Sequence, residues 1–408
     1  MNPALLEAVR FFTRETEIMS GLSVACGDGS RLETAWDGTE AGERTVFDLA
    51  SVTKLFTALC AMKLKEDGLL DFSRPVSDYA PAFRGLSGVT VDQLMSFQLM
   101  IRTPGRIDAC ETRDQAMDCL LQAAPAGLPG RRAYSDIPAM ILKYVVEAAA
   151  GAPLAECVRR MILLPAGMTE TWAEVPEDRL KDCELYDGEH RIEGEKRLVR
   201  RGFRGVPHDP KAAVLQGRGG DLSGHAGLFS TRQDLVRFCR AALAGRLVGE
   251  ASLREMAVNR TGRPWPEGGF TQYLGRQCYL RHPDQYFSEI PAYMGGWAFG
   301  IGGFTGNHLS LDPERGIFTV MLGNRVRDRL TVLIPEEGRT LTDYGLLPDG
   351  RGRIRWEDGK WIPSSVQYVH QKDEHLHRVI AEVMGWEPVS WAEAAERNPS
   401  LRSCPGIS

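Results

Sequence analysis

The order in which strand-like and helix-like patterns follow one another constrains the fold of this 408-residue chain most strongly. Residues 21–27 and 31–36 have the pattern of a strand pair around a Gly-Asp-Gly turn. Residues 308–311 and 317–322 have the pattern of another pair near the opposite end. Between the pairs, apolar residues recur mainly at helical spacing. Such an order predicts an α/β (α+β) protein, in which both chain ends build one sheet around an inserted helical domain.

The chain is too long for one compact core, so we expect two packed domains. Residues 1–70 and 226–408 would form the sheet domain, and residues 71–225 the mostly helical domain. Within the sheet domain, residues 331–369 form a polar insertion with a small hairpin near 357–359. We interpret this insertion as surface decoration by default. A dimerisation arm and a lid over the site are the alternatives, and the sequence does not give the oligomeric state.

Six helices are expected from apolar periodicity and from Gly or Pro stop signals such as Gly151. They cover the N-terminal segment with Leu5, Leu6, Val9 and Phe12, residues 52–65, 137–150, 154–164 and 234–243, and a last helix with Leu376, Val379, Ile380 and Val383. The stretch 201–224 is predicted to be a loop.

Composition excludes several classes of partner. The net charge of −5 and the pI near 6.0 do not favour nucleic acid or an anionic membrane surface. No apolar run approaches the roughly 20 residues of a membrane span, and no signal peptide is recognisable at the N-terminus. The nine cysteines are scattered without a C-x-x-C pair, which is typical of reduced thiols that fill a core. We therefore expect a cytoplasmic protein, with a processed mature form as the alternative.

Ser51 and Lys54 are the first candidates for chemistry. Ser51 begins a predicted helix, and Lys54 lies three residues later on the same face. A serine hydroxyl is a weak nucleophile that needs an adjacent base, and a buried lysine can serve as one. The positive end of the helix also favours a developing oxyanion. The alternative is that Ser51 merely caps the helix and that Lys54 is solvated.

Tyr134 is the second candidate, in the run Tyr-Ser-Asp at 134–136 just before a predicted helix that Ser135 or Asp136 could cap. A tyrosine near a serine and a lysine can relay a proton to a leaving group. The alternative is a packed aromatic ring whose hydroxyl is satisfied elsewhere.

A resemblance to a known family links these candidates. Residues 47–54 (FDLASVTK) resemble the active-site block of class C β-lactamases, family VIII esterases and D-alanyl-D-alanine carboxypeptidases, and residues 133–137 (AYSDI) resemble their second block. Matching stretches in the same order are GLLD at 68–71 with PVSDY at 75–79, LPAGMTET at 164–171, and VPHDP at 206–210 with GHAGLFST at 224–231. The chain thus resembles this serine β-lactamase-like, penicillin-binding-protein-like family from about residue 20 to 330.

The resemblance implies a fold and a set of roles. The fold would be an antiparallel sheet flanked by helices, with a mostly helical domain and the site in the cleft between them. Ser51 would become acylated, Lys54 would share or accept its proton, and Tyr134 would be the second acid/base. The backbone N–H groups of Ser51 and Phe304 would form the oxyanion hole, with Gly303 and Asp136 lining the site. No metal or cofactor is implied.

The third motif departs from the family pattern. Relatives carry K-T-G or H-T-G where this chain has FGIGGFTG at 299–306, so Ile301 replaces a basic or imidazole residue. An apolar residue lining the site there favours a neutral ester, amide or acyl group over a carboxylate. Residues 94–100 (LMSFQLM) depart as well. Arg102 and Arg106 follow them closely and could restore the lost charge, or they are simply surface arginines.

The histidines carry weaker hypotheses. His225 could suggest a Ser-His-Asp triad, but within residues 224–227 we interpret it as a structural loop residue because Lys54 already supplies a base. His370, His375 and His377 lack metal-ligand spacing and are expected on a solvated face.

The favoured hypothesis is a serine hydrolase that forms an acyl-serine intermediate on an ester or amide of a small or peptide-like substrate. The alternatives are a D-amino-acid peptidase or carboxypeptidase, a weak β-lactamase, an acyltransferase to a small acceptor, and a non-catalytic binding protein of the same fold.

Overall fold

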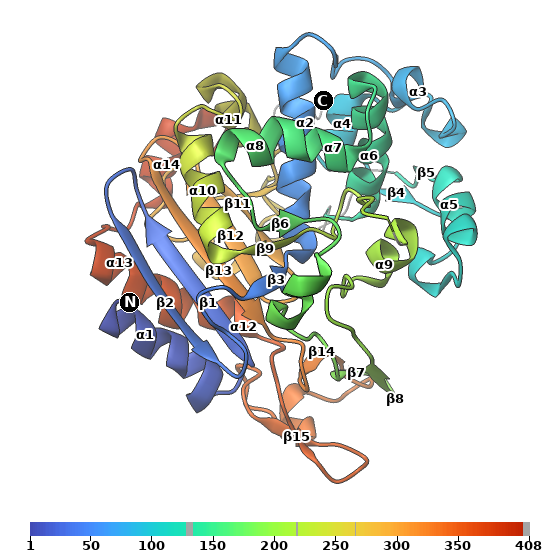
Figure 1. The fold of residues 1–408 in the computed structure, drawn as a ribbon. Coiled ribbons are helices and arrows are strands. Elements are labelled where there is room, and N and C mark those ends of the chain that lie inside the picture. The colour runs from blue at the N-terminus through green and yellow to red at the C-terminus, as the bar shows by residue number, and fades with distance from the viewer. Residues whose placement is uncertain (128–133, 218, 266, 403–408) are drawn as a thin grey trace.

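Both chain ends meet in one six-stranded antiparallel sheet (Figure 1). The computed structural model describes residues 1–127, 134–217, 219–265 and 267–402. In spatial order the strands are β10 (Tyr279–Leu280), β11 (Phe299–Gly303), β12 (Asn307–Asp312), β13 (Ile317–Asn324), β1 (Gly21–Gly27) and β2 (Leu32–Gly38). Strand β1 pairs with β13, with Gly21 opposite Asn324. The prediction of one sheet from both chain ends is confirmed.

Alternate side chains of the sheet enter two separate cores. On β13, Phe318, Val320 and Leu322 join the main core, while Ile317 and Met321 face a second core on the opposite side. The main core includes α2 (Thr53–Glu66), α6 (Ile137–Ala150) and α10 (Arg232–Leu243), and the second includes α1 (Pro3–Arg10) and α13 (Arg378–Met384). Figure 1 shows α1 and α13 beside each other against the sheet. The sheet is therefore covered by helices on both faces.

The predicted helices are present, with small differences at their ends. Helix α6 ends at Ala150, and Gly151 takes a left-handed conformation with φ of +64° that suits a glycine after a helix. The helix expected at 154–164 consists of α7 (Leu154–Val158), the π-helical turn η5 (Arg159–Leu163) and α8 (Leu164–Ala166).

Several further helices are short. They are α3 (Val76–Tyr79), α4 (Val91–Met95), α5 (Arg113–Leu121), α9 (Pro210–Gln216), α11 (Glu250–Met256), α12 (Tyr368–Gln371) and α14 (Trp391–Arg397). Helix α9 lies inside the stretch 201–224, so the prediction that all of it is a loop is wrong. Asp209 caps this helix by accepting hydrogen bonds from the N–H groups of Lys211 and Ala212, and Pro210 takes the first helical position.

Small sheets connect distant parts of the chain. Two of them have three strands and two have a single strand pair. They are β3 (Val46–Asp48), β9 (Phe229–Thr231) and β6 (Thr171–Trp172); β14 (Leu330–Ile334), β7 (Glu189–Glu193) and β8 (Lys196–Arg200); β4 (Ile101–Arg102) with β5 (Ala124–Pro125); and β15 (Arg353–Arg355) with β16 (Trp361–Pro363). Strand β7 runs parallel to β14, although about 140 residues separate them. Part of the segment 71–225 thus pairs directly with strands outside it.

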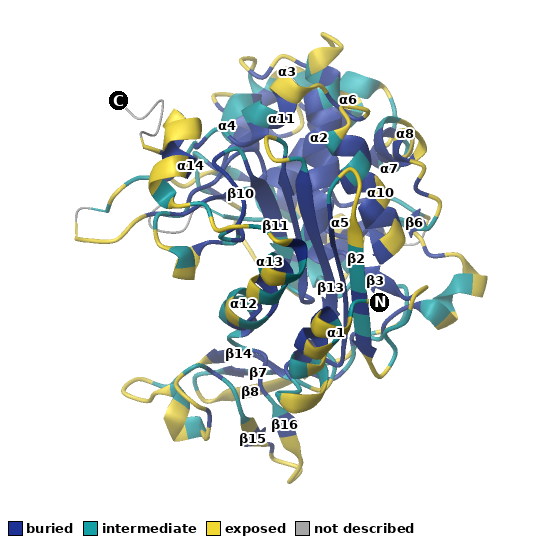
Figure 2. Cartoon of the chain, turned by 90° about the vertical axis from the view of Figure 1, so that its left-hand side faces the viewer, coloured by how far each residue is buried: buried dark blue, intermediate teal, exposed yellow. Residues whose placement is uncertain are grey.

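The polar segment 331–369 has a structure of its own. The hairpin expected near 357–359 is confirmed as β15 and β16. Leu333, Ile354 and Trp356 form a small apolar cluster there with Ile192 of β7. Figure 2 shows β7, β8, β14, β15 and β16 gathered at one end of the molecule, opposite helices α3 and α6.

The cysteines and the apolar helices belong to the protein interior. None of the eight described cysteines is in a disulfide, and six of them are buried. Over the described ranges, no single helix is long and apolar enough to cross a membrane. One pair, Ile137–Ala150 with Leu154–Ala166, meets the length and composition limits only when taken together across a 73° bend.

Candidate active site

Ser51 and Lys54 lie together where the chain enters α2. Ser51 belongs to the 3₁₀ turn η2 (Ala50–Val52), and Lys54 is in the first turn of α2. Lys54 Nζ donates to Ser51 Oγ at 2.9 Å, to Asp136 Oδ1 at 2.7 Å and to the His225 carbonyl at 3.3 Å. The Lys54 side chain is fully buried. An ammonium group has three donors, so these contacts satisfy Lys54 completely while holding it against the serine.

Asp48 fixes the turn that carries Ser51. Its buried carboxylate accepts hydrogen bonds from the N–H groups of Ala50, at 2.9 Å, and His208, at 2.7 Å. Its carbonyl accepts from Thr305, in the turn between β11 and β12, and from Asn307, the first residue of β12. Ala50 has a φ of +45°, a region that costs a non-glycine residue roughly 1–3 kcal/mol. Strain at the residue before the candidate nucleophile is thus sustained by a fully buried anchor.

Asp136 and Lys211 extend the charged network beyond Lys54. Lys211 Nζ lies 3.2 Å from Asp136 Oδ2 and 2.9 Å from Asp209 Oδ2. Burial alone would raise the pKa of Asp136, but Lys54, His225 and Lys211 together outweigh it and hold that pKa far below its usual value. Asp136 precedes α6 without capping it, because its side chain makes no hydrogen bond to the helix N-terminus. Of the two residues that could have capped this helix, Ser135 and Asp136, the second does not cap it with its side chain.

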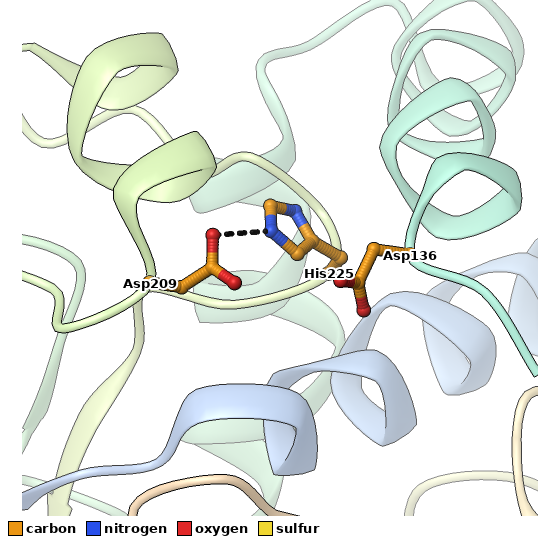
Figure 3. Close-up of side chains that lie close together, drawn as sticks. All are labelled: Asp136, Asp209 and His225. Atoms are coloured by element: carbon orange, nitrogen blue, oxygen red, sulfur yellow. Dashed lines mark hydrogen bonds and ion pairs between the residues drawn. The ribbon is translucent and has the colours of Figure 1, made fainter. Parts of the chain in front are cut away.

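Asp136, Asp209 and His225 come close enough to resemble a metal site (Figure 3). Their candidate ligand atoms all lie within 4.8 Å of one another, and His225 Nε2 is 3.1 Å from Asp209 Oδ1. The ammonium groups of Lys54 and Lys211 already bind the two carboxylates and supply positive charge there. A metal ion would have to displace Lys211, so the donor set fits a lysine-bridged network better than a metal.

Tyr134 is held between two aromatic rings. The ring centroid of Phe97 lies 5.4 Å away and that of Tyr279 5.3 Å away, and Lys54 Nζ is 5.0 Å from the centroid of Tyr134. The buried Tyr134 hydroxyl completes no hydrogen bond with another described residue. Burial raises the pKa of Tyr134 well above 10, with Asp136 acting in the same direction and the nearby Ser51 hydroxyl against it. The tyrosine is therefore protonated at neutral pH and can donate to a bound group.

A cavity of about 280 Å³ opens over these residues. Ser51, Tyr134, Asp136 and Phe304 line it. The other lining residues are Ala50, Asp108, Arg191, Arg200, His208, Asp209, Pro210, Lys211 and Ala226. Because most of these side chains are polar or charged, the cavity suits a polar substrate.

The third motif approaches Ser51 through its backbone. A Cβ atom added to Gly303 would lie 2.9 Å from the Leu49 carbonyl, so β11 lies against the turn that carries Ser51. Phe304 lines the cavity, as its expected place in the oxyanion hole requires. Ile301 does not line it among the described residues: it is fully buried in the main core. The interpretation of Ile301 as a substrate-lining residue that makes the site neutral is therefore wrong.

Sequence reasoning missed the charged residues of the cavity. Lys211, Arg191 and Arg200 supply positive charge, whereas Arg102 and Arg106 are exposed and do not line the cavity. Arg191 and Arg200 belong to strands β7 and β8, in the segment 71–225 that the sequence predicts to be mostly helical. Lys211 directly follows the motif at 206–210, and this position next to a family motif was the signal that could have indicated Lys211 as a site residue.

Two of the histidine interpretations can be compared with the structure. His225 is buried and binds Asp209, while Lys54 is the group beside Ser51. His377 is not on a solvated face as expected, because it is only 3% exposed and its Nδ1 lies 2.8 Å from Asp373 Oδ1. His375 stacks on Phe11 and His370 on Tyr286.

Comparisons with known proteins agree with this geometry. The family model described as Beta-lactamase matches residues 11–334. A putative D-alanyl-D-alanine carboxypeptidase of Salmonella schwarzengrund (strain CVM19633) is 26% identical over 336 residues, which cover 76% of this chain and 75% of that protein. The chain belongs to the β-lactamase family, whose members are serine hydrolases.

Solved structures share the fold at low sequence identity. EstCE1, a hydrolase with promiscuous acyltransferase activity, superposes with a TM-score of 0.62 at 20% identity, covering 79% of this chain and 93% of that one. The D-amino acid amidase from Ochrobactrum anthropi SV3 superposes with a TM-score of 0.59 at 16% identity, covering 94% and 98%. The β-lactamase-like fold predicted from the motifs is thus confirmed.

Proposed function

We propose that this protein hydrolyses an ester or amide through an acyl-enzyme intermediate on Ser51. One observation carries the proposal: the buried Lys54 ammonium group donates to Ser51 Oγ at 2.9 Å on the floor of a polar cavity. Membership of a serine hydrolase family supports it.

The arrangement assigns a step to each group. For the attack Lys54 acts in its neutral amine form: Ser51 Oγ attacks the carbonyl carbon as its proton passes to Lys54 Nζ, and Lys54 later returns a proton to Tyr134. The oxyanion is stabilised by the N–H groups of Ser51 and Phe304 together with the positive end of α2. Tyr134, whose hydroxyl is protonated and has no partner among the described residues, gives a proton to the leaving group. Water then attacks the acyl-enzyme, which releases the acid and restores Ser51.

Asp136 and Lys211 act as positioning residues in this scheme. The Asp136 carboxylate holds the Lys54 ammonium group, and Lys211 holds the other oxygen of Asp136. This chain of charges keeps Lys54 pointed at Ser51 rather than along the cavity wall.

Labelling with a fluorophosphonate and turnover of short p-nitrophenyl esters test the proposal together. Wild-type protein and the Ser87→Ala variant, which changes an exposed serine outside the cavity, should be labelled and active. Ser51→Ala should lose labelling and at least about 10³-fold in kcat, because no other group replaces the nucleophile. A folded wild-type protein that is neither labelled nor active would contradict the proposal and favour a non-catalytic binding role.

Two finer alternatives share the acyl-enzyme and differ in what enters or leaves it. An acyltransferase would give the acyl group to a small acceptor instead of water. A peptidase would take D-amino-acid peptides, as the name of the Salmonella relative suggests for that protein. Partitioning of the acyl group between water and an added alcohol or amine separates the first alternative, and release of a terminal D-amino acid identifies the second.

A further inference from the structure

One buried carboxylate organises the side of the cavity next to Phe304. Glu189 on β7 is fully buried, and its oxygens lie 2.7 Å from Arg191 Nε, 3.0 Å from His208 Nε2 and 3.3 Å from an Arg200 terminal nitrogen. Thr331 of β14 donates to it at 2.6 Å. Two guanidinium groups thus share a single carboxylate, and both line the same cavity as Ser51.

The other charged groups that line the cavity, with the buried Lys54 next to it, are paired as follows. Lys54 and Lys211 contact Asp136 and Asp209, which gives two cations for two anions. Asp108 binds Arg106, which lies outside the cavity lining. The Arg191, Arg200 and Glu189 group is therefore the place where these side chains leave an excess of positive charge.

Arg191 is free to bind a planar anion. Its Nε is used by Glu189, and its guanidinium group lies 5.3 Å from the ring centroid of Phe304. Its two terminal nitrogens donate no hydrogen bond to any other residue in the described part of the chain, and the side chain is 20% exposed. A guanidinium group anchored in this way presents two parallel N–H donors that match a carboxylate.

The position of Arg191 places such an anion near the reacting carbonyl. Phe304 is both the expected oxyanion donor and the ring beneath Arg191. A cavity of about 280 Å³ admits only a small part of a substrate beside Ser51. A carboxylate bound by Arg191 would therefore share this small cavity with the scissile carbonyl.

From these contacts we infer that Arg191, supported by Arg200, forms a carboxylate-binding subsite, and that the substrate is an ester or amide with a carboxylate close to its scissile bond. The inference rests on the proposed acyl-enzyme chemistry at Ser51. In this proposal, the Arg191 guanidinium group on the β7–β8 strand pair supplies the positive charge that relatives carry at the position of Ile301.

Matched substrates test the subsite. One pair is mono-p-nitrophenyl glutarate and its methyl ester, with the carboxylate on the acyl side. The other is a hippuryl thioglycolate and its methyl ester, with the carboxylate on the leaving group. The wild type should prefer the acid in at least one pair by tenfold or more in kcat/KM. Arg191→Met keeps an apolar stem over Phe304 and should lower kcat/KM for that acid roughly 10- to 100-fold. The neutral partner should change less than about threefold.

Lys196→Met is the control, because Lys196 is an exposed cation on the neighbouring strand β8 and lies outside the cavity. It should leave the preference intact. Wild-type turnover without preference for an acid in either pair would overturn the subsite and leave the proposed function standing. An equal loss on acid and ester in Arg191→Met would also overturn it, since Arg191 would then only support Phe304. A protein that neither turns over any substrate nor reacts with fluorophosphonate would overturn both.

Discussion

At the scale of single residues, the site combines groups that the sequence indicates with groups that it conceals. Ser51, Lys54 and Tyr134 could be named because short motifs carry them, and the structure brings Lys54 to 2.9 Å from Ser51 Oγ. Arg191 and Glu189 could not be named, because a charged residue on a strand looks the same in sequence whether it faces solvent or a cavity. Their roles depend on the parallel pairing of β7 with β14.

Tyr134 gives the prediction at this scale. Tyr134→Phe removes the hydroxyl but keeps the ring between Phe97 and Tyr279. Because the raised pKa of Tyr134 keeps it protonated, the variant loses the proton donor for the leaving group. We expect kcat to fall about 10²- to 10⁴-fold for an alkyl ester or amide, whose leaving group needs a proton. The loss should be clearly smaller for a p-nitrophenyl ester.

Parallel kcat measurements on both substrate types check this expectation, with far-ultraviolet circular dichroism as the control for folding. Equal losses on both would mean that Tyr134 acts on the attack of Ser51 and not on the leaving group.

At the scale of elements, local signals were sufficient where the element is set by its own residues. The helix at 137–150 was predicted to the residue because an apolar repeat precedes a glycine stop. Apart from the hairpin of β15 and β16, the small sheets were not predicted, because their strands are short and most of these sheets pair segments far apart in sequence. Strand β8 illustrates this. Its apolar residues Leu198 and Val199 lie next to each other between basic residues, so apolar and polar residues do not alternate clearly. Its partner β7 also consists mostly of charged residues.

The contact between β11 and the turn η2 gives a prediction at the element scale. In Gly303→Ala the new Cβ atom would lie 2.9 Å from the Leu49 carbonyl, a backbone atom that cannot rotate away. Strand β11 must then move from Ser51, which misplaces the expected oxyanion donor Phe304. We expect kcat to fall about 10²-fold or more, the size seen when one oxyanion donor is lost.

Gly302→Ala is the matched control, because its added Cβ atom comes no closer than 3.4 Å to its neighbours, and its nearest one is the Glu289 carboxylate. Steady-state kinetics of both variants on one p-nitrophenyl ester distinguish the outcomes. Similar activities for the two variants would contradict the close packing of β11 against η2.

At the scale of the whole molecule, Glu189 joins segments that come from different parts of the chain. It lies on β7 and binds Arg200 of β8, His208 of the following loop and Thr331 of β14. Burial alone would raise the pKa of Glu189, but hydrogen bonds and charges from His208 and Arg191 lower it to about 2. The folded protein thus holds this carboxylate ionised more strongly than the unfolded chain does, whose glutamate has a pKa near 4.5.

This difference makes the stability of the molecule depend on pH. A carboxyl group with a lowered pKa in the folded state stabilises fully above its unfolded pKa, and the stabilisation is lost as pH falls from about 4.5 to about 2. The shift corresponds to about 3 kcal/mol at neutral pH. Glu189→Gln should therefore be less stable than the wild type by several kcal/mol at pH 7, since it also leaves Arg191 and Arg200 without their buried partner.

Urea unfolding of both proteins between pH 7 and pH 2.5 measures the effect. The difference in the free energy of unfolding between the two proteins should shrink as pH falls below 4.5. Protonation of Glu189 then removes its negative charge in the wild type, and the Glu189→Gln variant lacks this charge at every pH. Glu387→Gln is the control, since Glu387 is an exposed residue and its substitution should leave the pH profile unchanged. A difference between wild type and Glu189→Gln that stays constant across this range would show that ionised Glu189 does not hold the two arginines, and the excess positive charge beside Phe304 would then lack its anchor.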